Sequence, residues 1–132
     1  MCPSTRTGVS LRASIARVLN FDLQSETRDE NVLVRIRGDF DVQVAARATD
    51  ALTELEARAP SSLVIDLRDV SFMDSSGMAV IASAHARATA VGRRFAVVAP
   101  PAGVRHAFEV SGLADVVPVV EDLARVYPDW IA

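Results

Sequence analysis

The segment at residues 63–67, with the sequence LVIDL, is a short and nearly continuous apolar run. Runs of this kind are typical of strands buried on both faces, as in a parallel sheet covered by helices. A second run of the same character occupies residues 95–99. Beside these strands, three segments have helical patterning: residues 43–59, 75–91 and 101–111. The alternation of strands with helices predicts an α/β fold with right-handed crossovers.

Two further strands are predicted before the first helix. Residues 21–27 and 32–37 have strand-like patterns and are joined by a polar turn at residues 28–31, which indicates an initial β-hairpin. Residues 116–120 are predicted as the last strand and residues 121–127 as the last helix. The expected fold is a single domain with a mixed, mostly parallel sheet of about five strands and about four helices. The order of the strands stays open.

The domain is expected to span residues 21–127, followed by a C-terminal tail at residues 128–132. With 132 residues, half of them apolar, the chain is long enough for one core. Residues 1–20 contain arginines but no acidic residue, and such a composition also fits an organellar transit peptide. Four apolar residues in this segment recur at helical spacing: Leu11, Ile15, Val18 and Leu19. We expect an N-terminal extension that is flexible or a short helix, and whose removal leaves the domain folded.

Composition excludes several classes of function. Charged residues of both signs are mixed along a chain of net charge -3, so neither a nucleic-acid binder nor a disordered tail is indicated. No apolar run approaches the roughly 18 residues of a membrane span. The single cysteine, Cys2, argues against disulfides and for a cytoplasmic setting. All 14 basic residues are arginine, which disfavours P-loop, receiver-domain and Schiff-base chemistry, since each relies on a lysine.

Acidic residues follow two of the predicted parallel strands. Asp39 and Asp41 come after the second strand, whereas Asp69 and Asp74 come after LVIDL. Open α/β sheets place their sites at the carboxyl ends of the strands. If the two strands are neighbours, these carboxylates surround the serines of the Asp74–Gly77 motif at one edge of the sheet.

The motif Asp74-Ser75-Ser76-Gly77 is predicted to be the N-terminus of a helix, with Asp74 as its N-cap. The unpaired N–H groups and partial positive charge of a helix start would tolerate a phosphate on Ser75. Gly77 keeps the first turn narrow, so another protein could approach the serines closely. Because Asp and Ser are common at helix starts, an ordinary cap without function remains an alternative.

The residues at this edge do not favour serine hydrolysis or a dedicated metal site. A serine nucleophile needs a base within reach, but His85 is predicted roughly 15 Å further along the same helix and His106 lies on another. Aspartates at a strand edge can bind Mg²⁺, but Asp41 also has a role as the N-cap of its own helix. We therefore expect no catalytic residue, no metal site, no cofactor and no enzymatic activity.

Residues 63–79, LVIDLRDVSFMDSSGMA, resemble the signature of STAS domains, in which a strand ending in Asp-Leu leads to Asp-Ser-Ser/Thr-Gly at a helix start. Residues 34–42 (VRIRGDFDV) resemble the family's strand followed by Gly, an acidic residue, an apolar residue and Asp. Residues 104–113 (VRHAFEVSGL) resemble its third-helix pattern. The resemblance covers about residues 21–127 and implies a STAS-type fold.

Among STAS proteins, this chain resembles the stand-alone bacterial anti-sigma-factor antagonists. The resemblance implies that the unmodified protein binds an anti-sigma factor that is also a serine kinase, which releases the sigma factor. It implies that this kinase phosphorylates Ser75, that the phosphate switches binding off, and that a phosphatase reverses it. Partner contacts are expected at the motif and beside it: Asp39, Asp41, Asp74, Ser75, Ser76, Gly77 and Met78.

One feature departs from the family pattern, which usually has Leu-Gly after the motif's glycine. This chain has Met78 and Ala79 there, and the methyl group of Ala79 bears on how a kinase recognises the site. The alternative function is that of a STAS interaction subunit in another assembly, such as a lipid-transport or stressosome-like complex, without sigma control.

Overall fold

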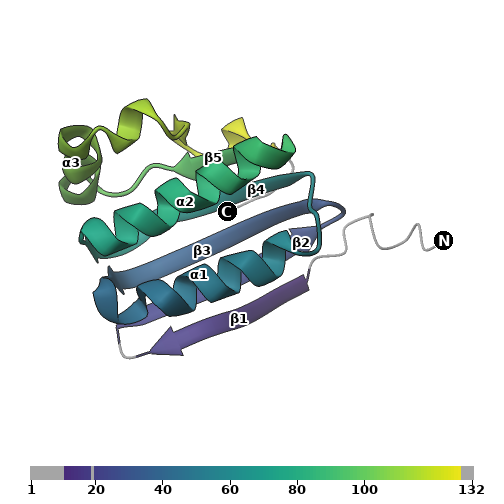
Figure 1. Cartoon of the computed structure of the whole chain (residues 1–132), viewed down its shortest axis with the longest axis horizontal. Helices are drawn as coiled ribbons and strands as arrows, with labels where there is room; N and C mark the ends of the chain where they lie inside the picture. The colour runs from purple at the N-terminus through teal and green to yellow at the C-terminus, as the bar shows by residue number, and fades with distance from the viewer. Residues whose placement is uncertain (1–10, 19, 129–132) are drawn as a thin grey trace.

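The computed structural model describes residues 11–18 and 20–128. Over these residues the chain forms a six-stranded sheet, with three α-helices on one side of it (Figure 1). The strands are β1 (Leu11–Val18), β2 (Phe21–Arg28), β3 (Asn31–Phe40), β4 (Ser62–Met73), β5 (Arg94–Val98) and β6 (Val119–Val120). The helices are α1 (Val42–Glu56), α2 (Ser75–Val91) and α3 (Ala102–Ser111), with the short 3₁₀ turns η2 (Leu113–Asp115) and η3 (Leu123–Arg125).

The strands are ordered β1-β2-β3-β4-β5-β6 across the sheet. β1, β2 and β3 pair antiparallel, whereas β3, β4, β5 and β6 pair parallel. The predicted α/β class, the initial hairpin and the mostly parallel sheet are confirmed. We expected the acidic residues after the two strands to meet at one edge of the sheet if the strands are neighbours. β3 and β4 are neighbours in the sheet.

Three predictions about the ends of the chain need correction. Leu11–Val18 is a strand and not a short helix, because antiparallel pairing with β2 satisfies its backbone, whereas an isolated helix of this length is marginal. The last predicted strand shrinks to Val119–Val120 after Pro118, which has no N–H for a ladder. In place of the last helix there is only the 3₁₀ turn η3. Residues 1–10 and 19, and the tail beyond residue 128, lie outside the described residues.

The main core lies between the helices and the sheet. Its largest fully buried side chains include Phe40, Leu52, Ile65, Ile81 and Phe108. Helices α1 and α2, which connect β3 to β4 and β4 to β5, bury one face each against alternating residues of β3 and β4. This packing fixes the position of both helix starts relative to the ends of β3 and β4.

A smaller apolar cluster lies on the opposite face of the sheet. Leu123 and Tyr127, in and after η3, cover four strand residues: Leu33, Val64, Ala96 and Val98. The Tyr127 hydroxyl donates to the carbonyl of Val32 and shares a hydrogen bond with the Ser62 hydroxyl. The described C-terminal segment is thus anchored across the start of β4.

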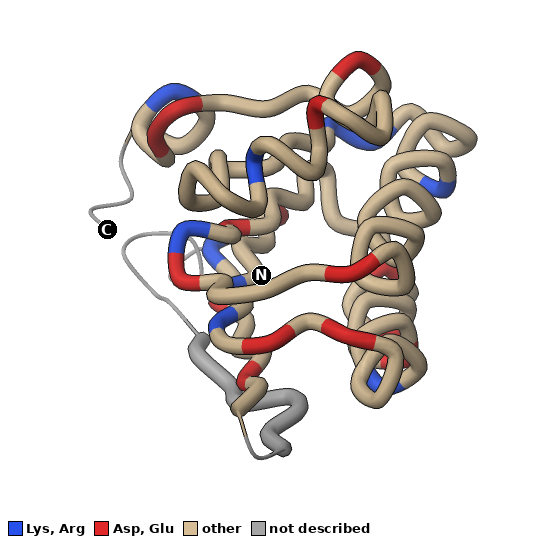
Figure 2. Tube along the Cα trace, turned by 90° about the vertical axis from the view of Figure 1, so that its left-hand side faces the viewer, with Lys and Arg blue, Asp and Glu red and all other residues tan. Residues whose placement is uncertain are grey.

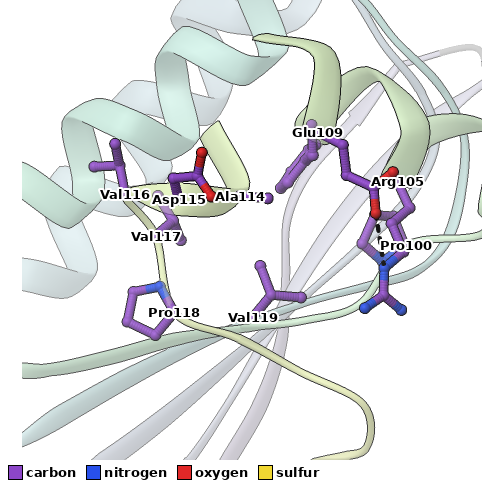
Figure 3. A pocket seen from close by; sticks show the side chains of 10 residues that line it. Pro100, Arg105, Glu109, Ala114, Asp115, Val116, Val117, Pro118 and Val119 are labelled. Carbon is purple, nitrogen blue, oxygen red and sulfur yellow. Dashed lines mark ion pairs between the residues drawn. The ribbon is translucent and has the colours of Figure 1, made fainter. Parts of the chain in front are cut away.

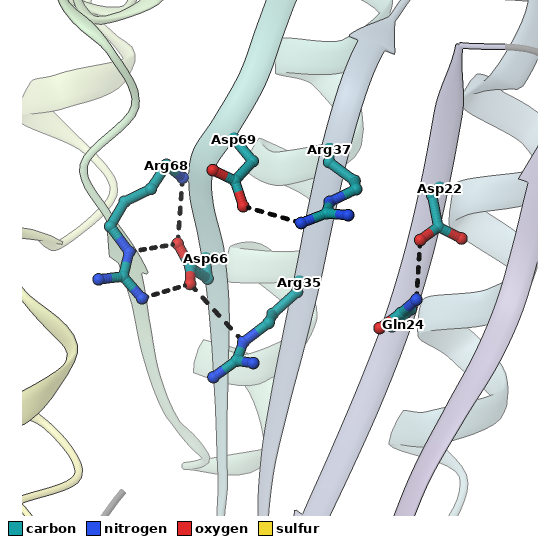
Figure 4. Close-up of polar contacts among 7 residues, drawn as sticks. All are labelled: Asp22, Gln24, Arg35, Arg37, Asp66, Arg68 and Asp69. Atoms are coloured by element: carbon teal, nitrogen blue, oxygen red, sulfur yellow. Dashed lines mark hydrogen bonds and ion pairs between the residues drawn. The ribbon is translucent and has the colours of Figure 1, made fainter. Parts of the chain in front are cut away.

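The rest of this second face is polar and carries paired charges (Figure 4). The buried carboxylate of Asp66 accepts hydrogen bonds from Nε and Nη2 of Arg68 at 3.0 and 2.8 Å, and lies 3.9 Å from Nε of Arg35. Arg37 pairs with Asp69 at 3.5 Å. Each of these three arginines therefore faces a carboxylate, and Asp66 is shared by two of them. No helix in the described part of the chain is long and apolar enough to cross a membrane.

Candidate functional site at the carboxyl edge of β3 and β4

The loops after β3 and β4 lie side by side at one edge of the sheet. Phe40 pairs with Met73 at the last rung of the ladder, and the N–H of Asp74 donates to the carbonyl of Phe40 at 3.3 Å. Figure 2 looks onto this edge and shows acidic residues gathered on the neighbouring loops. The structure therefore brings Asp39, Asp41 and the Asp74 motif together, as the strand pattern predicted.

Asp74 connects the two loops through its side chain. Its Oδ1 accepts hydrogen bonds from the N–H groups of Ser76 and Gly77, at 2.9 and 3.1 Å. Its Oδ2 accepts from the N–H of Val42, at 3.2 Å, in the first turn of α1. The predicted N-cap is confirmed, and the same carboxylate also holds the start of the neighbouring helix.

Asp41 caps α1, as predicted. Its Oδ1 accepts a hydrogen bond from the N–H of Gln43 at 3.0 Å. The Asp41 side chain is half-buried, and so is that of Asp39 in the same loop. The two caps place two carboxylates beside the starts of α1 and α2, and Asp39 lies two residues before Asp41 in the same loop.

Ser75 is exposed, whereas Ser76 and Met78 are half-buried. The Met78 sulfur accepts a long hydrogen bond from the Ser111 hydroxyl, at 3.6 Å, which connects the start of α2 to the end of α3. Of the two serine hydroxyls, that of Ser75 is therefore the more accessible to an enzyme acting from outside.

Gly77 has a different role from the one its motif suggested. It is buried, and a Cβ at this position would lie 2.7 Å from the carbonyl oxygen of Phe40 and 2.8 Å from Cγ of Met73. The glycine is required by the packing of α2 against the end of β3. Our expectation that Gly77 also leaves room for an approaching partner stays a prediction.

Three of the N–H donors at the start of α2 are already occupied. The N–H groups of Ser76 and Gly77 bind Asp74 Oδ1, and that of Met78 binds the Asp74 carbonyl. A phosphate on Ser75 would therefore be favoured by the helix dipole but would lie next to a carboxylate that holds those donors. This differs from the open anion site that the sequence suggested.

Two exposed apolar side chains beside the motif were not predicted. Val42 is 68% exposed and Phe72 is 50% exposed, although both adjoin buried elements. Phe72 reaches the surface because β4 uses two more residues than β3 between the paired positions Arg35–Asp66 and Phe40–Met73. Such bulges turn a side chain away from its regular face. The sequence hints at this exposure, because apolar and polar residues stop alternating in the segment DVSFM at residues 69–73.

The described residues near the serines do not form a catalytic constellation. The ring of His85 packs against Phe95, with centroids 5.4 Å apart, and His106 is exposed on α3. Neither histidine hydrogen-bonds to Ser75 or Ser76 in the described part of the chain. Within residues 11–18 and 20–128, no group of three His, Cys, Asp or Glu side chains is arranged to hold a metal ion.

A separate hollow of about 450 Å³ lies between α3, η2 and β6 (Figure 3). Its lining combines apolar residues with the charged side chains of Glu109 and Asp115. Arg105 at its border is held by Glu121, with Nη2 and Oε2 2.6 Å apart. The hollow lies on the β6 side of α3 and shares no lining residue with the Asp74 motif.

The geometry agrees with a comparison against known families. The model of the STAS domain matches residues 22–126. The chain belongs to the STAS domain family. The anti-sigma-B factor antagonist of Staphylococcus aureus is 22% identical over 103 residues, which cover 78% of this chain and 95% of that protein.

Solved structures of anti-sigma factor antagonists share the fold. An anti-sigma factor antagonist from Mycobacterium paratuberculosis is 25% identical, with a TM-score of 0.73 over 82% of this chain and 92% of that one. The anti-sigma factor antagonist SpoIIAA in its unphosphorylated form is 25% identical, with a TM-score of 0.61 over 83% and 99% of the two chains. Bacillus SpoIIAA in the phosphorylated form has a TM-score of 0.56 and 24% identity over 80% and 97%. The predicted STAS resemblance is thus confirmed.

Proposed function

We propose that this STAS protein is an anti-sigma factor antagonist controlled by phosphorylation of Ser75. In the unphosphorylated form it binds an anti-sigma factor that is also a serine kinase, and this binding releases the sigma factor. The kinase transfers a phosphoryl group to Ser75, which ends the interaction. A phosphatase removes the phosphate and restores binding.

The observation that carries the proposal is the exposed Ser75 hydroxyl in the first turn of a capped helix. A kinase needs an acceptor hydroxyl that it can reach without unfolding the substrate. Ser75 meets this requirement, because Asp74 and not Ser75 makes the capping hydrogen bonds. Ser76 is less exposed, and its N–H is engaged with that cap.

Electrostatics explain how the phosphate switches binding off. Phosphorylation adds about 1.5 to 2 negative charges at neutral pH. Asp39, Asp41 and Asp74 already make this edge acidic, and the N–H groups of Ser76 and Gly77 are occupied by Asp74. A partner fitted to a neutral serine would have to desolvate the new charge beside carboxylates, which is strongly unfavourable.

The fold tolerates the same modification because Ser75 is exposed and lies at the positive end of the α2 dipole. The phosphate can remain hydrated, so it need not displace the Asp74 cap. We therefore infer that the phosphoprotein stays folded while its affinity falls. The remaining contacts of the interface are assigned to Asp39, Asp41, Asp74, Ser76 and Met78, which surround the acceptor.

The named relatives support this proposal. The Staphylococcus aureus relative is an anti-sigma-B factor antagonist, and the structure of SpoIIAA in a phosphorylated form identifies that antagonist as a phosphoprotein. Both align over most of their length with this chain, across the segment that contains Ser75.

The proposal is tested by affinity capture with two baits, the unmodified protein and the Ser75→Asp variant. The unmodified bait is expected to retain an anti-sigma factor, identified by mass spectrometry, and to release its sigma factor in a reconstituted complex. Ser75→Asp is expected to retain much less. Capture of transporter subunits in place of an anti-sigma factor would refute sigma control and favour a role in another assembly.

A further inference from the structure

Met78 differs from the other described methionine in its exposure. The chain has three methionines, of which Met73 and Met78 lie in the described residues. Met73 is buried, with 6% of its surface exposed. Met78 is half-buried: part of it packs against the main core, and the rest lies at the surface of α2. An exposed thioether can be oxidised to a sulfoxide, so the two methionines should differ in reactivity.

Met78 also lies beside the proposed phosphoacceptor. Ser75 and Met78 are three residues apart in α2, and residues at this spacing are neighbours on the surface of a helix. A partner that covers the Ser75 hydroxyl therefore also meets the exposed part of Met78. A change in the polarity of this side chain acts on the same surface as a phosphate on Ser75.

The sulfur of Met78 is held by the end of α3. The Ser111 hydroxyl donates a hydrogen bond to this sulfur at 3.6 Å, and the same hydroxyl lies 3.1 Å from the carbonyl oxygen of Phe108. An oxygen added to the sulfur in the direction of Ser111 would lie closer to the hydroxyl than a hydrogen bond allows. The oxidised side chain therefore has to shift, or its new oxygen has to point into solvent.

Either arrangement changes the surface next to Ser75. A sulfoxide is polar, and burying a polar group in an interface without a hydrogen-bond partner is unfavourable. The fold is expected to survive, because the hydrogen bonds of the Asp74 cap go to backbone groups and do not use the Met78 side chain. Oxidation would thus lower the affinity for a partner and leave the domain folded.

We propose that Met78 is a site of reversible oxidation, and that its sulfoxide weakens binding of the anti-sigma factor without phosphorylation of Ser75. The oxidant is a peroxide. The lone pair of the sulfur forms the S–O bond, the O–O bond of hydrogen peroxide breaks, and water leaves, so the sulfur loses the two electrons that the peroxide gains. A methionine sulfoxide reductase reverses the step: two thiols become a disulfide, and the oxygen leaves as water.

This inference rests on the proposed function and adds a second kind of regulation to the same site. The test treats the full chain with hydrogen peroxide and then with dithiothreitol, which reverses a disulfide or sulfenic acid at Cys2 but not a methionine sulfoxide. Peptide mass spectrometry is expected to show faster formation of the sulfoxide at Met78 than at Met73, because only Met78 is partly exposed.

Isothermal titration calorimetry then measures binding of the anti-sigma factor identified by capture. Oxidised protein is expected to bind about tenfold more weakly, as for one polar group buried without a partner, and to recover after treatment with methionine sulfoxide reductase. Met78→Leu is the matched control, because leucine has a similar volume and no sulfur. It should bind normally before and after peroxide, although it keeps Cys2, Met73 and Trp130. Met78→Gln carries a polar group and should bind weakly without peroxide.

Circular dichroism and thermal melts check that both variants and the oxidised protein are folded. Equal loss of binding by peroxide-treated Met78→Leu would assign the effect to another residue and overturn the proposal. So would equal rates of oxidation at Met73 and Met78, or normal binding by the oxidised protein or by Met78→Gln. In each of these cases the proposed function stands if the Ser75 phosphoprotein does not bind. If the unmodified protein binds no anti-sigma factor, both proposals fall.

Discussion

The two ends of the β3–β4 pair use similar polar residues in opposite ways. At the start of β4, the hydroxyls of Ser62 and Tyr127 bond to each other, and the Tyr127 hydroxyl also donates to the Val32 carbonyl. Both side chains are buried. Nearby, Glu56 and Arg87 tie the ends of α1 and α2 together, with Oε1 and Nε 2.6 Å apart. These groups satisfy one another inside the molecule.

At the other end, polar side chains accept hydrogen bonds from backbone N–H groups, and several residues around them stay exposed. Asp41 and Asp74 cap α1 and α2, and the Ser75 hydroxyl between these loops stays exposed. Val42 and Phe72 remain exposed there as well. The first end contributes mainly to stability, whereas the second is the surface that we propose binds a partner. Variants at the two ends should therefore separate stability from binding.

The largest loss of stability is expected from Tyr127→Ala. Removing a buried aromatic side chain costs about 3–5 kcal/mol, so the free energy of unfolding should fall by about 3 kcal/mol or more. Tyr127→Phe removes only the hydroxyl and should cost about 1 kcal/mol. Urea unfolding measures both. Partner binding by the folded fraction should be unchanged. Weaker binding would contradict the assignment of stability to one end and partner binding to the other.

The same end predicts a stability change at high pH. Burial raises the pKa of Tyr127 to about 12. Because the folded-state pKa lies above that of an exposed tyrosine, the stabilisation is complete below about pH 10 and is lost as the pH rises towards 12. The expected loss is on the order of 2 kcal/mol, since one pKa unit corresponds to about 1.4 kcal/mol.

This change can be measured cleanly, because Tyr127 is the only tyrosine and the chain has no lysine to titrate in the same range. The tyrosinate absorbance of the native protein should appear near pH 12, and urea unfolding should show the loss of stability only when Tyr127 is present. A native titration midpoint near pH 10 would contradict the buried environment.

At the open end, Asp74→Ala is expected to lower stability by about 1–2 kcal/mol, as for other lost N-caps. The variant loses the bonds to Ser76 and Gly77 as well as that to Val42. Asp74→Asn can keep the cap through its oxygen but not the bond to Val42, so it should cost less than Asp74→Ala. Thermal melts compare the three proteins. Equal losses of stability in both variants would show that the hydrogen bonds to Ser76 and Gly77 do not contribute to stability.

The smallest effect on stability is expected from Asp41→Asn. Asparagine caps about as well as aspartate, so the free energy of unfolding should change by less than about 0.5 kcal/mol. If the charge of Asp41 faces the partner, affinity or the rate of phosphorylation should still change. Calorimetry and a kinase assay measure these. No change in either would leave Asp41 as a cap for α1 alone.

The sequence predicts what depends on local patterns. The LVIDL strand and the Asp41 and Asp74 caps follow from residues that lie next to one another in the chain. The role of Gly77 depends on Phe40, and the exposure of Phe72 depends on the register between β3 and β4. The local spacing of apolar residues does not predict contacts of this kind, because their partners are distant in the sequence. The strand at Leu11–Val18 was missed because its apolar residues also fit helical spacing, and only β2 decides between the two.

The most direct test of the account is binding by the phosphorylated protein. The unmodified chain is incubated with its anti-sigma factor kinase and ATP, the modified residue is mapped by mass spectrometry, and the affinity of the purified phosphoprotein is measured. A single phosphate is expected on Ser75, with a circular dichroism spectrum like that of the unmodified protein and a large loss of affinity. Ser76→Ala should still accept the phosphate, and Ser75→Ala should not. Phosphate on Ser76, or undiminished binding by protein phosphorylated on Ser75, would contradict the proposed switch.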